Sequence, residues 1–224
     1  LVAERNRPPL TRMPLHPGET TQITRLFGFL LLGEQLAGDM AARQAALAPA
    51  PKLGRFLQTQ ARQEAFHAVV FQGAIHWLAP RGPRVPPRHP SMERYRGLME
   101  SALARGDLVE SLLALQVLLE AMGDVVLEAI DAGIERRGLG FRRLRHVLRQ
   151  QEQTHHAFGV HQLANLVSAD ATQRARLQGQ AQNYLEVIDV MFAELEGLFL
   201  DFDEDPSDYR HAFQRRLPVW LAPA

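Results

Sequence analysis

Two pairs of side chains in this sequence have the spacing of ligands that can share an ion. Glu64 and His67 are three residues apart, and Glu152 and His155 repeat that spacing. Residues three apart lie on one face of a helix, so each carboxylate and imidazole can reach a common atom. Carboxylate oxygen and imidazole nitrogen together are suited to binding a transition-metal ion. Taken alone, however, each pair is also what a solvated helix face would carry.

Two further glutamates interrupt apolar helix faces. Glu34 shares a helical face with Phe27 and Leu30, and Glu120 directly follows the largely aliphatic run 112–119. An isolated carboxylate inside a helical bundle costs several kcal/mol, so it must be protonated, ion-paired or bound to a metal. For each glutamate considered singly, an ion pair with arginine explains the position as well as a metal does.

The order of these residues along the chain favours the metal. A lone glutamate followed by a Glu-x-x-His pair occurs twice, and the corresponding glutamates are 86 and 88 residues apart. Four carboxylates would offset the charge of two divalent ions, and oxygen-rich, sulfur-free ligation suits iron or manganese better than structural zinc. We therefore predict a site for two iron ions (Fe²⁺/Fe³⁺), with manganese or a mixed Mn/Fe pair as the alternative. The predicted metal ligands are Glu34, Glu64, His67, Glu120, Glu152 and His155.

Four polar residues near the ligands have two interpretations each. Gln63, Gln151 and Gln116 could hydrogen-bond a ligand, although glutamine on a helix is more commonly exposed. Asp124, one turn after Glu120, could support a ligand or lie at the surface.

Proline and glycine divide the chain into long helical segments. The expected helices cover about 20–48, 53–79, 91–105, 107–136, the segment from 141 to about 167, 170–200 and 208–216. Ser91 and Asp107 are candidate N-caps, as is Ser168 or Asp170. Valine and isoleucine fall at helical spacing and no segment alternates like a strand, so the fold class is all-α. We expect an irregular lead-in over 1–19, a bundle domain over 20–200 and a tail with a short helix over 201–224.

The composition of the 224 residues excludes several classes of protein. Apolar residues make up 46% and charged residues 22%, which indicates a globular chain rather than a disordered one. Cysteine is absent, which rules out disulfides, thiolate metal sites, iron–sulfur clusters and cysteine nucleophiles. The formal net charge of zero argues against a nucleic-acid partner. No apolar run is long enough to span a membrane and no signal peptide is visible, so a cytoplasmic location is expected.

The ligand order resembles that of the ferritin-like carboxylate-bridged dimetal bundles, in which two helices each supply a glutamate and two others each supply a Glu-x-x-His pair. The resemblance covers roughly residues 20–200 and implies a four-helix bundle with additional helices and a dimetal site in its core. Gly33-Glu34-Gln35 and Glu152-x-x-His155-x-x-Phe158-Gly159 look like the ligand motifs of the cyanobacterial aldehyde-deformylating oxygenases. Ala41 and Leu127 stand where that family is expected to have a tyrosine, so its fold and ligands carry over better than its aldehyde chemistry. A bacterial tRNA hydroxylase of the same superfamily is a further alternative, which the zero net charge disfavours.

Two classes of function stay open at this point. The first is a non-haem di-iron oxygenase or oxidase that activates O₂ and oxidises a small, largely apolar organic substrate. Such an enzyme would need an external electron donor, and it could form a homodimer. The second is a ferroxidase, peroxide-scavenging or iron-handling protein without an organic substrate. No catalytic residue is predicted beyond the metal ligands. Six apolar residues lie near the ligands in sequence and could line a pocket or simply pack in the core: Phe27, Leu30, Phe66, Phe71, Met122 and Phe158.

Overall fold

The computed structural model describes residues 17–82, 88–136, 142–201 and 203–221, and in these ranges the chain forms helices and no strands. The predicted all-α class is therefore confirmed. The elements are α1 (Pro17–Leu47), α2 (Pro51–Leu78), α3 (Pro90–Ala104), α4 (Leu108–Leu112), a π-helix (Leu113–Leu119), α5 (Glu120–Arg136), α6 (Arg142–Ala169), α7 (Ala171–Leu200), α8 (Pro206–Arg216) and a 3₁₀ turn (Val219–Leu221).

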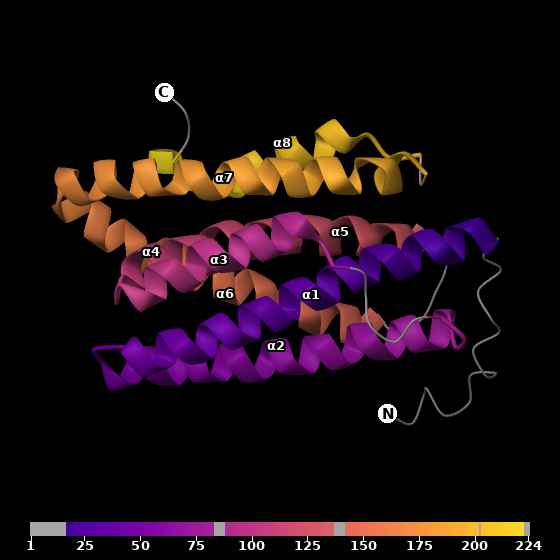
Figure 1. The fold of residues 1–224 in the computed structure, drawn as a ribbon, viewed down its shortest axis with the longest axis horizontal. Coiled ribbons are helices and arrows are strands. Elements are labelled where there is room, and N and C mark those ends of the chain that lie inside the picture. The colour runs from indigo at the N-terminus through magenta and orange to yellow at the C-terminus, as the bar shows by residue number, and fades with distance from the viewer. Residues whose placement is uncertain (1–16, 83–87, 137–141, 202, 222–224) are drawn as a thin grey trace.

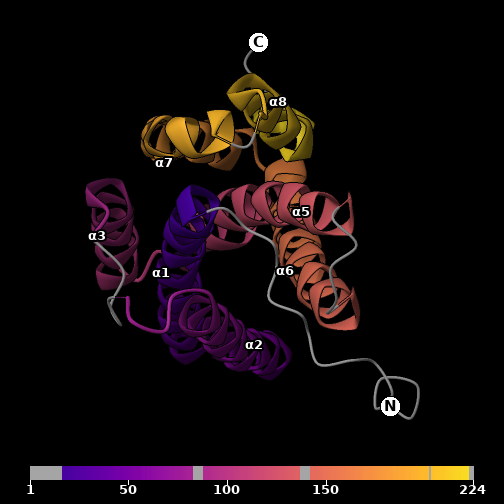
Figure 2. The same cartoon turned by 90° about the vertical axis from the view of Figure 1, so that its right-hand side faces the viewer.

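Four segments form the central bundle, and the others cover it. Helices α1 and α2 lie side by side along much of their length, and α5 packs on α6 (Figure 1). The end-on view shows α2 and α6 on the side of the molecule opposite α7 and α8, with α3 beside α1 (Figure 2). Gly38 permits the close approach of α1 and α2, because a Cβ atom there would lie 3.3 Å from Cβ of Glu64. The segments that carry the predicted ligands thus surround a common core.

Residue chemistry at the helix ends explains most of the boundaries. Helices α2, α3 and α8 each have proline in the first turn, where its missing N–H is not needed. Asp107 and Asp170 cap α4 and α7 by accepting backbone N–H groups of the first turn, as predicted. The prediction for Ser91 is wrong: α3 begins with Pro90, and the Ser91 hydroxyl donates instead to Oε2 of Glu194 in α7, at 2.6 Å.

The predicted helix over 107–136 is not one continuous α-helix. A π-helix, whose hydrogen bonds span five residues instead of four, separates α4 from α5 and ends directly before Glu120. All seven of its residues are buried, so it is apolar around its whole circumference except for Gln116. Helix α6 packs tightly against this wider turn, since a Cβ atom on Gly159 would lie 2.4 Å from Cβ of Gln116.

The tail contains the short helix expected there, which begins two residues earlier than predicted, at Pro206. Residues 1–16 of the predicted lead-in lie outside the described residues, and the division at 19 and 200 stays a prediction. None of the helices that the structure describes is long and apolar enough to cross a bilayer.

Candidate metal centre

The structure brings all six predicted ligands together in the core of the bundle. Glu34 comes from α1, Glu64 and His67 from α2, Glu120 from the first turn of α5, and the last pair from α6. Each of the six residues has at most 8% of its surface exposed. Their ligand atoms form two groups, in each of which the atoms lie within 4.8 Å of one another: Glu34, Glu64, His67 and Glu152 in the first, Glu64, Glu120 and His155 in the second. Glu64 belongs to both groups.

His67 lies at the centre of the first group. Its Nδ1 atom is 2.8 Å from Oε1 of Glu152, 3.1 Å from Oε2 of Glu34 and 3.1 Å from Oε2 of Glu64. One N–H can point at only one of three oxygens, so hydrogen bonding alone does not explain why three carboxylates surround a single nitrogen. A shared cation would explain it, because a cation attracts all four atoms at once.

His155 has the equivalent place in the second group. Its Nδ1 atom is 2.9 Å from Oε1 of Glu64 and 3.6 Å from Oε2 of Glu120. The two carboxylate oxygens of Glu64 thus face different histidines. A glutamate in this position can bridge two ions, one on each side.

Two glutamines fix the outer edges of the imidazole rings, which is one of the two roles expected for them. Nε2 of His67 donates to Oε1 of Gln151, and Nε2 of His155 donates to Oε1 of Gln63, each at 2.8 Å. These bonds cross between α2 and α6 in opposite directions. Because a carbonyl oxygen only accepts, each Nε2 must carry a proton, and in the neutral ring the lone pair is then on Nδ1, directed into the cluster. This is the tautomer that a metal ligand needs.

A buried chain of glutamines lies next to the cluster, and two of its members, Gln60 and Gln44, were not predicted from the sequence. Nε2 of Gln60 donates to Oε1 of Glu120 at 2.6 Å and to Oε1 of Glu64 at 3.2 Å. Gln116 of the π-helix donates to Gln60 and Gln44, both of which are buried. Gln116 therefore reaches the ligands only through Gln60, which lies between them. The available signal was the position of Gln60 one turn before Glu64 on the same apolar face.

The electrostatics of the cluster without a metal show how much positive charge it needs. Burial, followed by repulsion from neighbouring carboxylates, raises the pKa of Glu34 and Glu120 well above the ordinary value. Burial would also raise the pKa of Glu64, but the close approach of both histidines outweighs it and lowers the pKa to about 2. Burial lowers the pKa of His67, yet the three carboxylates close to its Nδ1 atom raise the pKa on balance. Extra protons therefore hold the metal-free cluster together.

The donor set fits a pair of metal ions. Oε2 of Glu64, Oε1 of Glu152 and Nδ1 of His155 are buried without a well-formed hydrogen bond, although each faces the middle of the cluster. Buried polar atoms are almost always satisfied, so such atoms in a native core indicate a missing partner. Two divalent cations would supply that partner to all three atoms and would replace the extra protons.

The sequence left two interpretations of Asp124 open, support of a ligand or a position at the surface. The structure shows a third role. Asp124 is 5% exposed, and its Oδ2 accepts from Arg216 of α8 at 2.6 Å. The aspartate instead anchors α8 on α5.

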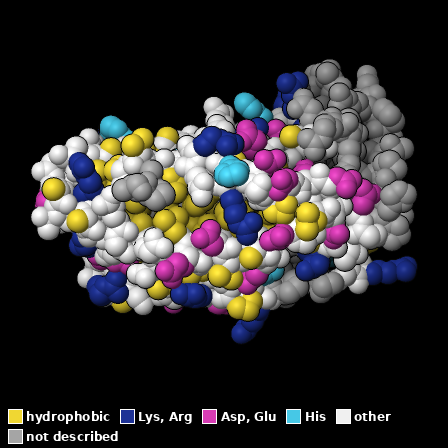
Figure 3. All heavy atoms as spheres, turned by 90° about the horizontal axis from the view of Figure 1, so that it is seen from above, with side chains coloured by type: hydrophobic (Ala, Val, Ile, Leu, Met, Phe, Trp, Pro, Cys, Tyr) yellow, Lys and Arg dark blue, Asp and Glu magenta, His cyan; other side chains and the backbone are white. Residues whose placement is uncertain are grey.

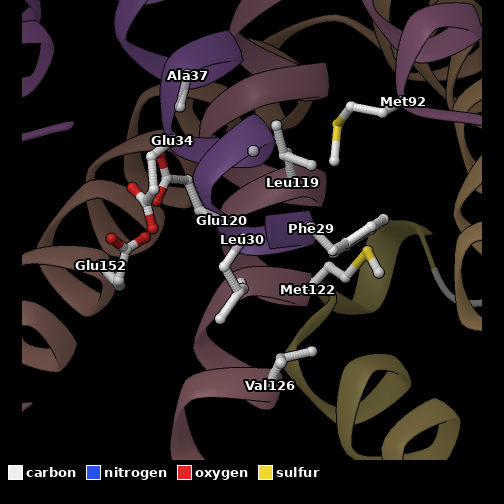
Figure 4. Close-up of a pocket in the computed structure, with 12 residues that line it drawn as sticks. Phe29, Leu30, Glu34, Ala37, Met92, Leu119, Glu120, Met122, Val126 and Glu152 are labelled. Carbon is white, nitrogen blue, oxygen red and sulfur yellow. The ribbon is translucent and has the colours of Figure 1, made fainter. Parts of the chain in front are cut away.

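A small pocket of about 40 Å³ opens beside the carboxylates. Figure 4 shows Glu34, Glu120 and Glu152 gathered at one end, with apolar side chains along the rest of the wall. The larger apolar lining residues are Phe29, Leu30, Met92, Leu119, Met122 and Val126. Of the apolar residues proposed from sequence, Leu30 and Met122 line this pocket, whereas Phe66 is 46% exposed on the outside of α2.

Comparison with known proteins supports the architecture. No family model matches the chain, and no curated protein matches its sequence. A solved structure does match: a protein with aldehyde deformylating oxidase activity from Synechococcus, with a TM-score of 0.76 and 18% identity, over 92% of this chain and 90% of that one. At this identity the likeness concerns the arrangement of the helices, which is the arrangement that the ligand order implied. The chain has the ferritin-like helical-bundle fold, with a buried carboxylate and histidine cluster in its core.

Proposed function

We propose that this protein is a non-haem di-iron oxidoreductase that activates O₂ and oxidises a small, largely apolar substrate. The observation that carries the proposal is the orientation of the two histidines. Each directs Nδ1 into the carboxylate cluster while a glutamine holds Nε2. The proposed ligands are Glu34, Glu64, His67, Glu120, Glu152 and His155. The structural likeness to a protein with aldehyde deformylating oxidase activity supports this assignment.

The protein's own residues would position and protect the site. Two bound iron ions would supply the redox chemistry of O₂ reduction. Glu64, which faces both histidines, would hold the ions at a fixed separation, and Gln60 restrains Oε1 of both Glu64 and Glu120. The apolar wall of the pocket offers few hydrogen-bonding partners to water, which would help to protect a strong oxidant from side reactions.

The lining of the pocket supports an apolar substrate. Apart from the three carboxylates at one end, its lining offers no charged side chain. An apolar group would enter such a wall without leaving polar atoms unpaired, whereas a sugar or nucleotide would lose its hydrogen bonds.

A second candidate, ferroxidase or peroxide-consuming activity without an organic substrate, is favoured by the size of the pocket. A volume of about 40 Å³ has room for O₂ or a few waters but not for a long chain unless side chains move. In that case the same ligands would bind iron, and oxidation of the iron itself would be the reaction.

Anaerobic loading tests both candidates. The metal-free protein is titrated with Fe(II) or Mn(II), the bound metal is counted after desalting, and O₂ uptake is then followed with and without apolar aldehydes, alkanes and amines. We expect about two ions per chain and O₂ uptake by the iron form. Product formed from an organic compound supports the oxygenase, whereas O₂ uptake that oxidises the iron and yields no organic product, with or without added dithionite, supports the ferroxidase. A protein that binds iron but reacts with neither O₂ nor added hydrogen peroxide would overturn both.

A further inference from the structure

The two helices that carry the Glu-x-x-His pairs have an unusual charge distribution. Glu64 is the only acidic residue of α2 and Glu152 is the only one of α6, and both are buried in the cluster. The same helices carry seven lysines and arginines: Lys52, Arg55, Arg62, Arg142, Arg143, Arg145 and Arg149. The zero net charge of the chain therefore conceals two helices whose exposed Asp, Glu, Lys and Arg residues are all basic. The opposite face, over α7 and α8, displays acidic and basic side chains together (Figure 3).

Several of these cations have no carboxylate partner. Arg145 and Arg149 pair with Asp131 and Glu128 of α5. In the part of the chain that the structure describes, the exposed Lys52, Arg55, Arg62, Arg142 and Arg143 form no ion pair. Unpaired cations on one side of a protein create a field that attracts an acidic partner.

On the outer face of α2, exposed apolar side chains follow the exposed arginines along the helix. Arg55, Arg62, Phe66, Val69 and Trp77 fall on a single helical face, which we name the α2 stripe. Phe66 is 46%, Val69 is 68% and Trp77 is 47% exposed. Gly73 lies on the same face, and a Cβ atom there would meet nothing within 4 Å. An arginine and aromatic surface of this kind, left open, is typical of a docking site for another protein.

The α2 stripe is close to the cluster but separate from the pocket. The ring of Phe66 is 6.3 Å from the ring of His67, whose Nδ1 faces three carboxylates. In contrast, the residues that line the pocket come from α1, α3, the π-helix, α5 and α6, and none comes from α2. A partner on the stripe would therefore be near a ligand of the metal site without obstructing the substrate's pocket. That arrangement suits the delivery of electrons rather than the delivery of a substrate.

We propose that the α2 stripe is the docking surface for an acidic one-electron carrier protein, which passes electrons to the dimetal site past Phe66 and His67. The inference rests on the proposed function, because that function needs an external reductant. Each encounter would oxidise the carrier by one electron and reduce one ferric ion by one electron, so two encounters restore two ferrous ions. Electron-transfer partners meet through small, transient interfaces, and the α2 stripe is confined to one face of one helix.

The test measures binding and electron delivery separately. An acidic [2Fe–2S] ferredoxin serves as the probe, and its Kd is measured with the metal-free and the iron-loaded protein at low and high salt. The reduction rate of the oxidised iron form is measured with reduced ferredoxin and, separately, with dithionite. In the double variant Arg55→Glu/Arg62→Glu we expect the Kd at low salt to rise about tenfold or more, because charge complementarity controls encounter. High salt should remove most of that difference.

A matched control makes the same change of charge at two arginines that lie outside the α2 stripe. Arg94 of α3 and Arg215 of α8 are exposed and, among the described residues, without an ion pair. The variant Arg94→Glu/Arg215→Glu should change the Kd by less than about twofold, since its charges lie away from the stripe. Trp77→Ser should weaken ferredoxin binding at high salt as well, because it removes apolar contact area. Reduction by dithionite should be the same in all of these variants.

Each other outcome has a defined meaning. Equal effects of the two double variants, or none, would overturn the docking surface. So would an Arg55- and Arg62-dependent interaction with anionic vesicles, with RNA or with a second copy of this chain when ferredoxin does not bind. If ferredoxin binds at the stripe but the iron-loaded protein never reacts with O₂, the proposed function fails and the interface stands. If O₂ chemistry proceeds with dithionite but ferredoxin does not bind, the interface fails and the function stands.

Discussion

Glu64 differs from the other five proposed ligands, because its two carboxylate oxygens face different histidines. Glu64→Ala should therefore reduce bound metal from about two ions per chain to below about one, whereas Glu120→Ala, which changes one group only, should leave about one. Metal analysis after desalting gives both numbers. Glu110→Gln is the control, since Glu110 is a buried acid of α4 that accepts from Tyr184 and lies in neither group. Retention of both ions by Glu64→Ala would contradict the site.

The glutamines that hold the histidines allow a finer test. Gln151→Leu removes the acceptor of His67, so the ring can rotate or change tautomer, and we expect metal affinity to fall about 10- to 100-fold. Gln63→Leu should do the same for His155. Stoichiometry at saturating metal should stay at two. Gln150→Leu, an exposed neighbour, is the control, and competition with a chelator measures the affinities. Unchanged affinity in both variants would mean that the glutamines do not orient ligands.

At the residue scale, the sequence predicted the repeated residues and missed the unrepeated ones. The lone glutamates and the Glu-x-x-His pairs occur twice in the same order, and that repetition identified six positions that the fold brings together. Gln44 and Gln60 belong to no repeated motif, and a glutamine on a helix is usually exposed, so nothing in the sequence indicated that they are buried. Only the structure shows that they are buried next to the carboxylates.

At the scale of the elements, proline, glycine and aspartate signals placed most helix ends within a few residues. The π-helix could not be predicted in this way. Its seven residues are buried on every side, so hydrophobic periodicity does not distinguish a wider turn from an ordinary one. The π-helix matters for the site because the extra residue in its turn rotates α5 about its axis. The direction in which Glu120 points therefore depends on it.

The packing of α6 against the π-helix gives the element-scale prediction. Gly159→Ala would place Cβ 2.4 Å from Cβ of Gln116 and 2.9 Å from its carbonyl carbon, so the helices must separate. We expect the free energy of unfolding to fall by about 1–3 kcal/mol. Gly179→Ala in α7 is the control: a Cβ there meets nothing within 4 Å, and alanine should stabilise the helix by about 0.5–1 kcal/mol. Chemical denaturation measures both, and equal effects would contradict the close packing.

At the scale of the whole molecule, the net charge is uninformative while its distribution is not. The count of 25 basic and 25 acidic residues indicates no preference for a charged partner. The folded chain, however, exposes the unpaired cations of α2 and α6 and buries the only two acidic residues of those helices. A count over the whole sequence cannot show this separation of charges, because it arises only when the helices pack.

The carboxylate cluster links the stability of the whole molecule to pH. In the metal-free protein the pKa values of Glu34 and Glu120 are raised by burial and by neighbouring carboxylates, and the carboxylates close to Nδ1 of His67 raise the pKa of that residue. A raised pKa contributes stability that is complete below the unfolded value and is lost as pH rises through the folded value. Glu64, with its pKa lowered to about 2, acts in the opposite direction and loses its contribution only as pH falls below its ordinary value.

The metal-free protein should therefore be most stable at mildly acidic pH and should lose stability steadily toward high pH. Bound metal supplies the positive charge that the extra protons supplied, so the loaded protein should be more stable and its melting temperature should vary less above neutral pH. Thermal melts of both forms across this range test the expectation. The variant Glu34→Gln/Glu120→Gln removes the two acids with raised pKa values, and its metal-free melting temperature should depend less on pH than that of the unsubstituted protein. A metal-free protein whose stability rises with pH would show that the cluster does not hold extra protons.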